Sequence, residues 1–109
     1  MATRRRKRGL GQAARKARMT TTKGWRGAAP KTRAQRRALY ERCGARAFLL
    51  PNQRDAGLSK FPVMARQGAC VPDCRGVRAA LQRASRYGYD EVARKARKLA
   101  RRGSCRWAE

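Results

Sequence analysis

The sequence predicts an α+β fold that is mainly helical: a small domain of three helices, with a short β-hairpin between helices one and two, preceded by a disordered basic arm. Three observations lead to this prediction. Apolar residues recur at helical spacing in the C-terminal half, and two short apolar runs in the middle suit strands. Residues 1–30, by contrast, hold ten Lys and Arg, no acid and few large apolar side chains. We therefore place the arm at residues 1–30 and a cysteine-containing globular domain at residues 31–109.

The first helix is predicted at residues 33–43. Thr32 and Gln35 have the spacing of a capping box, in which each side chain accepts a hydrogen bond from the other residue's backbone N–H. Gly44 then suits the end of the helix. Charged residues share the apolar side of this segment, so the capping pattern carries more of the prediction than the hydrophobic pattern does.

The hairpin is predicted from two apolar runs, residues 47–51 and 60–64, which flank a polar loop at residues 52–59. Short apolar runs bounded by turn residues are typical of strands. Pro62 has no N–H to donate to a sheet ladder, and this confines its strand to an edge or shortens it.

Two further helices are predicted at about residues 74–87 and 90–102. Asp73 and Asp90 stand where they can cap them. Each segment keeps its apolar residues on one side at 3.6-residue spacing and carries Arg or Lys elsewhere. A tight turn at residues 87–89 would join the two helices as an antiparallel pair.

The charge balance indicates a polyanionic partner. The chain has 30 Lys and Arg against 6 Asp and Glu, which gives a formal net charge of +24 at pH 7. Self-repulsion of this size opposes compaction until salt or a polyanion supplies countercharge. Arg outnumbers Lys, and its planar guanidinium suits bidentate contact with phosphate. We therefore expect the chain to bind nucleic acid, DNA rather than RNA, through phosphate contacts that do not depend on sequence.

The predicted nucleic-acid-binding residues form two groups, one in the arm and one on the outer faces of the two C-terminal helices. Basic helix faces are often only solvated, but ten cations on two helices, with acids only near the helix starts, favour binding. The arm group is Arg4, Arg5, Arg6, Lys7, Arg8, Arg15, Lys16 and Arg18. The helix group is Arg75, Arg78, Arg83, Arg86, Arg94, Lys95, Arg97, Lys98, Arg101 and Arg102.

The arm has two features that allow more than one role. The basic run at residues 4–8 can contact phosphate or act as a nuclear-import signal, and sequence does not separate these roles. Trp25 can stack on a base or dock on a partner protein.

Four cysteines, Cys43, Cys70, Cys74 and Cys105, stand where the predicted elements begin or end. They suit one structural zinc ion in an all-cysteine site, which is the site a chain without histidine can offer most simply. Only Cys70 and Cys74 are close in sequence, so disulfides and reduced thiols remain open alternatives.

Catalysis and membrane binding are not expected. Histidine, the commonest general acid and base, is absent, and no carboxylate pair stands outside a capping position. The recognised phosphate-binding glycine motifs are missing as well. The chain has no apolar run of membrane-spanning length, and its basic N-terminus lacks the apolar core of a signal peptide. We therefore expect a soluble intracellular protein.

Short motifs are spread over residues 42–107: Arg42-Cys43-Gly44, Phe48-Leu49-Leu50-Pro51, Lys60-Phe61-Pro62-Val63, Cys70, Asp73-Cys74-Arg75-Gly76 and Cys105-Arg106-Trp107. Together they resemble a family of small basic cysteine-containing proteins of nucleocytoplasmic large DNA viruses. The resemblance implies a giant-virus setting rather than an activity. It implies a location in the virion, and in the host cytoplasm or nucleus during infection. In such particles disulfides occur although assembly is cytoplasmic.

Three functions are consistent with these features. The first is a structural protein that condenses or organises a viral genome. The second is a minor capsid or cement protein whose cations meet acidic capsid proteins. The third is a ribosomal or other RNA-binding protein, because a basic arm on a small cysteine-containing domain suits that role too.

Overall fold

The structure is a computed structural model that describes residues 19–108. In these residues it is a small, mainly helical domain with one two-stranded antiparallel hairpin, which confirms this much of the predicted fold. None of the described helices is long and apolar enough to cross a membrane. The helices are α2 (Trp25–Ala28), α3 (Arg33–Cys43), α4 (Cys74–Arg86) and α5 (Asp90–Arg102), the strands are β1 (Phe48–Leu50) and β2 (Lys60–Pro62), and the 3-10 turns are η1 (Ala45–Ala47), η2 (Ala56–Leu58) and η3 (Arg106–Ala108).

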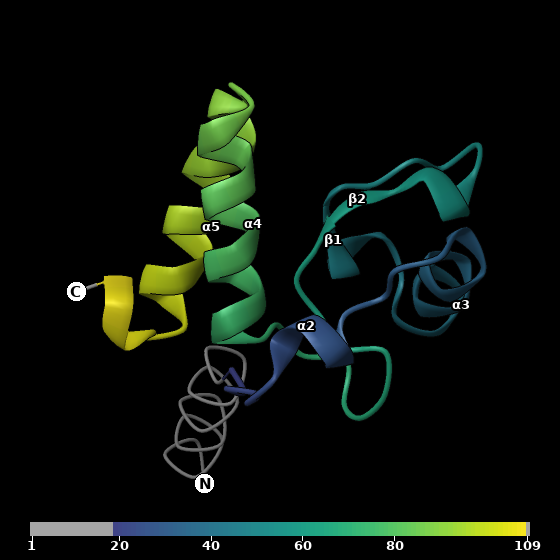
Figure 1. Cartoon of the computed structure of the whole chain (residues 1–109), viewed down its shortest axis with the longest axis horizontal. Coiled ribbons are helices and arrows are strands. Elements are labelled where there is room, and N and C mark those ends of the chain that lie inside the picture. Colours follow the sequence, from purple (N-terminus) through teal and green to yellow (C-terminus); the bar gives the residue numbers. More distant parts are fainter. Residues whose placement is uncertain (1–18, 109) are drawn as a thin grey trace, which may run out of the picture.

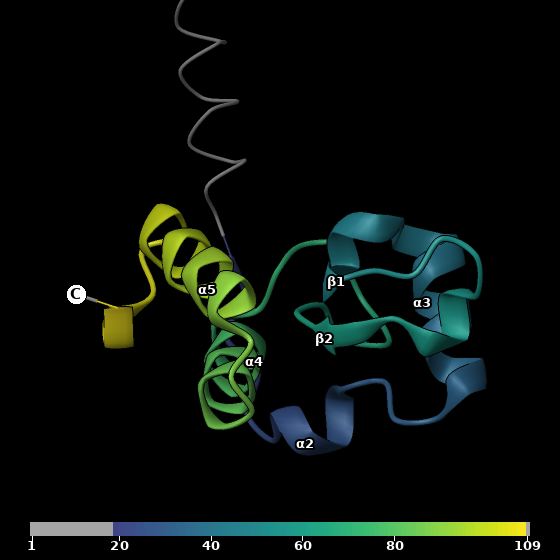
Figure 2. The same cartoon turned by 90° about the horizontal axis from the view of Figure 1, so that it is seen from above.

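The elements form two halves joined by the segment between β2 and α4 (Figure 1). One half is the antiparallel pair of α4 and α5, and the other contains α3 and the hairpin. Figure 2 shows the same division from above, with α2 beside the lower end of both halves. The halves are in contact, because α4 packs on β2 and α5 packs on β1. Within the hairpin, Phe48 pairs with Pro62 and Leu50 with Lys60.

The first long helix, α3, begins at a complete capping box. The Thr32 hydroxyl accepts a hydrogen bond from the Gln35 N–H at 3.0 Å, and the Gln35 side chain accepts one from the Thr32 N–H at 3.3 Å. The helix ends at Gly44, which has a φ of 85°. A side chain would strain this conformation, so glycine suits the position.

The two C-terminal helices begin differently. Asp73 caps α4, because its carboxylate accepts hydrogen bonds from the backbone N–H groups of Arg75 at 2.9 Å and Gly76 at 3.2 Å. The expected cap of α5 is wrong by one residue: Tyr89 occupies the cap position, and Asp90 is the first residue of the helix. In that position Asp90 still favours the helix, since its negative charge lies at the positive end of the helix dipole.

Residues 19–30, which the sequence assigns to the arm, pack against the domain. The Thr20 N–H donates to the Pro72 carbonyl at 3.1 Å, and the Thr20 carbonyl accepts from the Cys74 N–H at 2.7 Å. Residues 19–30 therefore belong to the packed part of the chain. The segment adds α2, a helix that the sequence analysis did not predict.

The core is built largely from small side chains. Six of its 17 buried apolar residues are alanine. Two disulfides supplement it: Cys43 with Cys70, and Cys74 with Cys105, which join positions 27 and 31 residues apart. Loops of this length correspond to about 3.5 kcal/mol of stabilisation for each bridge in the chain-entropy treatment. The cross-links therefore supply stability that the small core alone would not provide.

Candidate nucleic-acid interface

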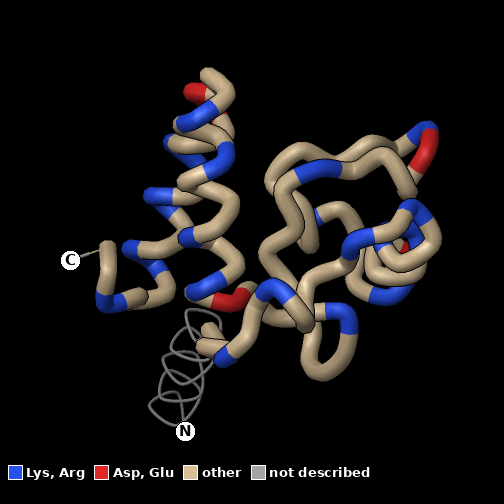
Figure 3. Tube along the Cα trace, viewed as in Figure 1, with Lys and Arg blue, Asp and Glu red and all other residues tan. Residues whose placement is uncertain are grey.

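The outer faces of α4 and α5 carry the predicted cations. Each helix buries an apolar stripe, which includes Val77, Ala80 and Ala84 in α4 and Val92 and Ala96 in α5. The cations lie on the surface that remains, and Figure 3 marks their positions along both helices in blue. All ten are exposed: Arg75, Arg78, Arg83, Arg86, Arg94, Lys95, Arg97, Lys98, Arg101 and Arg102.

The cations of α4 do not all face the same way. At 100° per residue, Arg75, Arg78 and Arg86 fall within one sector opposite the buried stripe. Arg83 falls to one side of that sector and lines a pocket next to the hairpin. The outer face of α4 is therefore formed by three arginines, and Arg83 belongs to a second site.

The cations of α5 cover its outer surface more completely. Arg94, Arg97, Lys98 and Arg101 follow the three- and four-residue steps that keep side chains on one helix face. Lys95 and Arg102, seven residues apart, lie beside this row. The two helices, which pack on each other, thus both present cations on their outer sides.

Acidic residues neutralise little of this surface. Among residues 19–108, the salt bridge found on it joins Arg94 to Glu91 at 3.8 Å, and both side chains are exposed. An exposed pair of this kind contributes about 0–1 kcal/mol. The other acids of the pair of helices, Asp73 and Asp90, lie at the helix starts. The remaining cations have no acidic partner in the described part of the chain.

Several arginines in the other half are held by internal contacts instead. Arg37 and Arg33 both bind Asp55, and their hydrogen bonds hold the pKa of that carboxyl below its usual range. Arg42 donates to the carbonyls of Gly68 at 2.6 Å and Arg66 at 2.8 Å. These arginines organise loops, and this distinguishes them from the cations on α4 and α5.

The arm group of predicted binding residues lies outside the described residues. Its members are Arg4, Arg5, Arg6, Lys7, Arg8, Arg15, Lys16 and Arg18.

The cysteines form two separate bridges in the structure. Cys43–Cys70 joins the end of α3 to the segment before α4, and Cys74–Cys105 joins the start of α4 to the chain after α5. Within residues 19–108, no cluster of three or more His, Cys, Asp or Glu side chains could hold a metal ion. Disulfide sulfurs are not thiolate ligands, so zinc on the four cysteines would require their reduction and stays a prediction.

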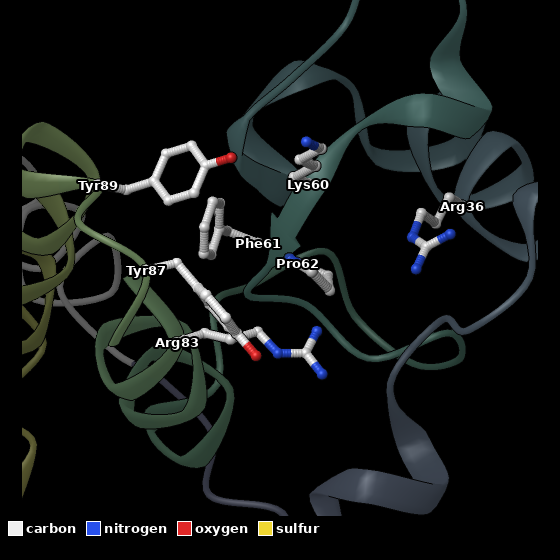
Figure 4. A pocket seen from close by; sticks show the side chains of 7 residues that line it. All are labelled: Arg36, Lys60, Phe61, Pro62, Arg83, Tyr87 and Tyr89. Carbon is white, nitrogen blue, oxygen red and sulfur yellow. The ribbon is translucent and has the colours of Figure 1, made fainter. Parts of the chain in front are cut away.

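Sequence reasoning missed a pocket of about 450 Å³ between β2 and the turn that joins α4 to α5. Three of its lining side chains are cationic and three are aromatic (Figure 4). Its sequence signals are the two tyrosines around Gly88 and the cation beside Phe61, but these positions are too far apart for spacing to connect them. The pocket is lined by Arg36, Lys60, Phe61, Pro62, Arg83, Tyr87 and Tyr89.

Comparisons with protein-family models, curated proteins and solved structures find no match for this chain. Its function therefore has to be inferred from the charge, burial and geometry of its own residues.

Proposed function

We propose that this chain is a sequence-nonspecific DNA-binding structural protein that condenses or organises a genome. The resemblance over residues 42–107 makes a viral genome, packaged in the virion, the expected substrate. The proposed binding unit is a domain of three long helices, with the hairpin between α3 and α4, and the basic N-terminal arm adds further phosphate contacts. The proposal requires no catalytic residue.

The observation that carries the proposal is the outer surface of α4 and α5, where nine exposed cations, three on α4 and six on α5, meet almost no acid among the described residues. Each helix has 13 residues, which corresponds to a length of about 20 Å. Duplex DNA presents about one phosphate per 1.7 Å of axis, or roughly 11 over that length. The number of cations thus suits the number of phosphates along the helix pair.

The composition of this surface favours phosphate over base contacts. Apart from Arg and Lys, the exposed polar residues of α4 are Gln82 and Ser85, and α5 contributes the acids at its start. Phosphate contacts position a protein on DNA but carry no sequence information. We therefore infer binding that varies little with base sequence.

Two double variants test this assignment. Each lowers the net charge of the chain by two, but at a different place. Arg97→Gln with Arg101→Gln removes two charges from the outer face of α5, and glutamine keeps a good helix propensity. Arg46→Gln with Arg54→Gln removes two exposed charges from the other half of the molecule. For a labelled DNA duplex, we expect the α5 variant to lose roughly 10–100-fold in affinity and to flatten the slope of log K against log salt by about 2. Equal losses of DNA affinity in both variants would contradict an interface on the outer faces of α4 and α5.

The other two functions give different outcomes in simple fractionations. A minor capsid or cement protein would stay with emptied shells, whereas a nucleoprotein would leave the particle with its DNA. A ribosomal or other RNA-binding protein would sediment with ribosomes until ribonuclease releases it.

A further inference from the structure

We propose that the pocket between β2 and the α4–α5 turn binds one unpaired nucleotide of a single-stranded nucleic acid. In this complex the base stacks on Tyr87, and the adjoining phosphate lies between Arg83 and Arg36. The inference rests on the proposed function, because it names a second mode of nucleic-acid binding by the same protein. The pocket has a volume of about 450 Å³, which falls within the range of small-ligand pockets, about 300–1,000 Å³.

The aromatic part of the pocket contains one ring that is available for stacking. Tyr87 is 63% exposed, although it follows directly on the last residue of α4. By contrast, Phe61 is buried and meets the ring of Tyr89 edge-on, with 5.1 Å between the ring centroids. The Phe61–Tyr89 pair thus forms a fixed wall, and the exposed ring of Tyr87 lies beside it (Figure 4). The guanidinium carbon of Arg86 lies over the Tyr87 ring, 5.8 Å from its centroid, so a base would stack on the opposite face of that ring.

The backbone of this wall is strained. Phe61 has a φ of 59°, in the left-handed region that bulky residues seldom adopt. Such conformations persist only where the surroundings impose them, and they concentrate at binding sites. In this conformation Phe61 packs against Tyr89, and the neighbouring Lys60 is exposed at the pocket.

The cations of the pocket come from three separate elements. Arg83 on α4 and Arg36 on α3 extend toward one another across the pocket (Figure 4). Lys60 on β2 lies beside the aromatic wall, with its Nζ 6.0 Å from the centre of the Tyr89 ring. Among residues 19–108, no carboxylate lines the pocket. An anion between the two guanidinium groups would offset their repulsion, and phosphate suits their planar donors.

The combination of a free aromatic face and converging cations indicates a nucleotide rather than a simple anion. Stacking on an aromatic ring with phosphate contacts to Arg or Lys is the pattern of single-strand binding sites. Bases inside a duplex have both faces covered by their neighbours, so along a strand only unpaired bases can stack on Tyr87. The pocket is therefore expected to favour single strands, while the outer faces of α4 and α5 accept duplex.

The test compares Tyr87→Ala with Tyr87→Phe and with Leu58→Ala, which truncates another exposed apolar side chain. The probes are a labelled oligothymidine of about 12 nucleotides and a duplex of about 12 base pairs, because single-strand sites cover about 4–16 nucleotides. We expect Tyr87→Ala to weaken oligothymidine binding by about 5–100-fold, with Tyr87→Phe and Leu58→Ala close to the unaltered chain. Duplex affinity should change by less than about twofold in all three variants, since their outer faces keep the same phosphate contacts.

Each contrary result has a separate meaning. If the unaltered chain binds duplex but Tyr87→Ala leaves oligothymidine binding unchanged, the pocket proposal is overturned and the proposed function stands. If the unaltered chain binds neither probe, both are overturned. If polyglutamate competes for the pocket as well as oligothymidine does, and in a Tyr87-dependent way, the ligand is an acidic peptide and the nucleotide assignment is wrong.

Discussion

The indole ring of Trp25 lies directly against Gly76: a Cβ added to Gly76 would stand 2.6 Å from two carbons of that ring. Trp25 belongs to the short helix α2, and Gly76 lies in the first turn of α4. The contact fixes residues 19–30 on the domain together with Asp73, which is fully buried and accepts hydrogen bonds from the hydroxyls of Thr20 and Thr22. Trp25 therefore packs within its own chain.

Substituting Gly76→Ala should release this contact. Alanine favours a helix over glycine by about 1 kcal/mol, but overpacking a tight contact costs about 1–3 kcal/mol. We expect a net loss of stability of up to about 2 kcal/mol and a shift of the Trp25 emission toward that of exposed tryptophan, measured in a Trp107→Phe background.

Gly27→Ala is the matched control, because Gly27 is also helical and a Cβ there would meet nothing within 4 Å. It should leave Trp25 emission unchanged and should not destabilise the chain. Wild-type emission and stability in Gly76→Ala would show that the indole does not rest on Gly76.

Reduction of the disulfides should unfold the domain. Each bridge corresponds to about 3.5 kcal/mol by loop length, and domains of this size have about 5–15 kcal/mol in total. Circular dichroism with increasing reductant should show the helical signal falling as the thiols appear. Retention of a cooperative thermal transition after full reduction would contradict this account.

The purified protein before any reduction distinguishes disulfides, a zinc site and reduced thiols. Alkylation without reductant, followed by peptide mass spectrometry, should find no free thiol and the pairs Cys43–Cys70 and Cys74–Cys105. Four alkylated cysteines together with one equivalent of zinc would establish the metal site instead, and four alkylated cysteines without zinc would indicate reduced packing thiols.

Salt should stabilise this protein against heat. The chain carries a net charge of +24, and folding brings these charges closer together, so screening favours the folded state. We expect the thermal midpoint to rise with sodium chloride, by about 4–8 °C for each kcal/mol gained. An equal concentration of an uncharged sugar serves as the control for solution effects. A midpoint that is constant or falls with salt would show that repulsion does not limit the fold.

The parts of the fold that local chemistry specifies could be predicted from the sequence. The capping pair Thr32 and Gln35 and the cap Asp73 act within one turn of backbone, and their hydrogen bonds are present in the structure. Asp90 is expected from the sequence to be the cap of α5, but it is the first helical residue, because the turn before α5 makes Tyr89 the cap residue. Such a shift is within the usual uncertainty of helix ends.

Long-range contacts set the features that could not be predicted. The short helix α2 has four residues and no side-chain cap, so its place depends on distant contacts: Trp25 with Gly76, and the hydrogen bonds of Arg66 to the carbonyls of Gly27 and Ala28. Four cysteines allow three pairings, and spacing does not choose among them. The pocket joins Arg36, Phe61 and Tyr87 from three elements, and no sequence window contains them all. The cations on α4 and α5 could be listed, but which arginines have internal partners became clear only from the fold.

The most direct test of the account is the salt dependence of binding by the intact chain to two DNA duplexes of unrelated sequence, measured by fluorescence anisotropy from about 50 to 200 mM sodium chloride. Six to ten phosphate contacts predict a slope of log K against log salt of about −5 to −9, a loss of roughly 10³–10⁵-fold in affinity over this range, and affinities for the two sequences within about threefold. Affinity that salt leaves unchanged, or that differs between the duplexes by about 10³-fold or more as in specific recognition, would contradict binding through the cationic faces of α4 and α5.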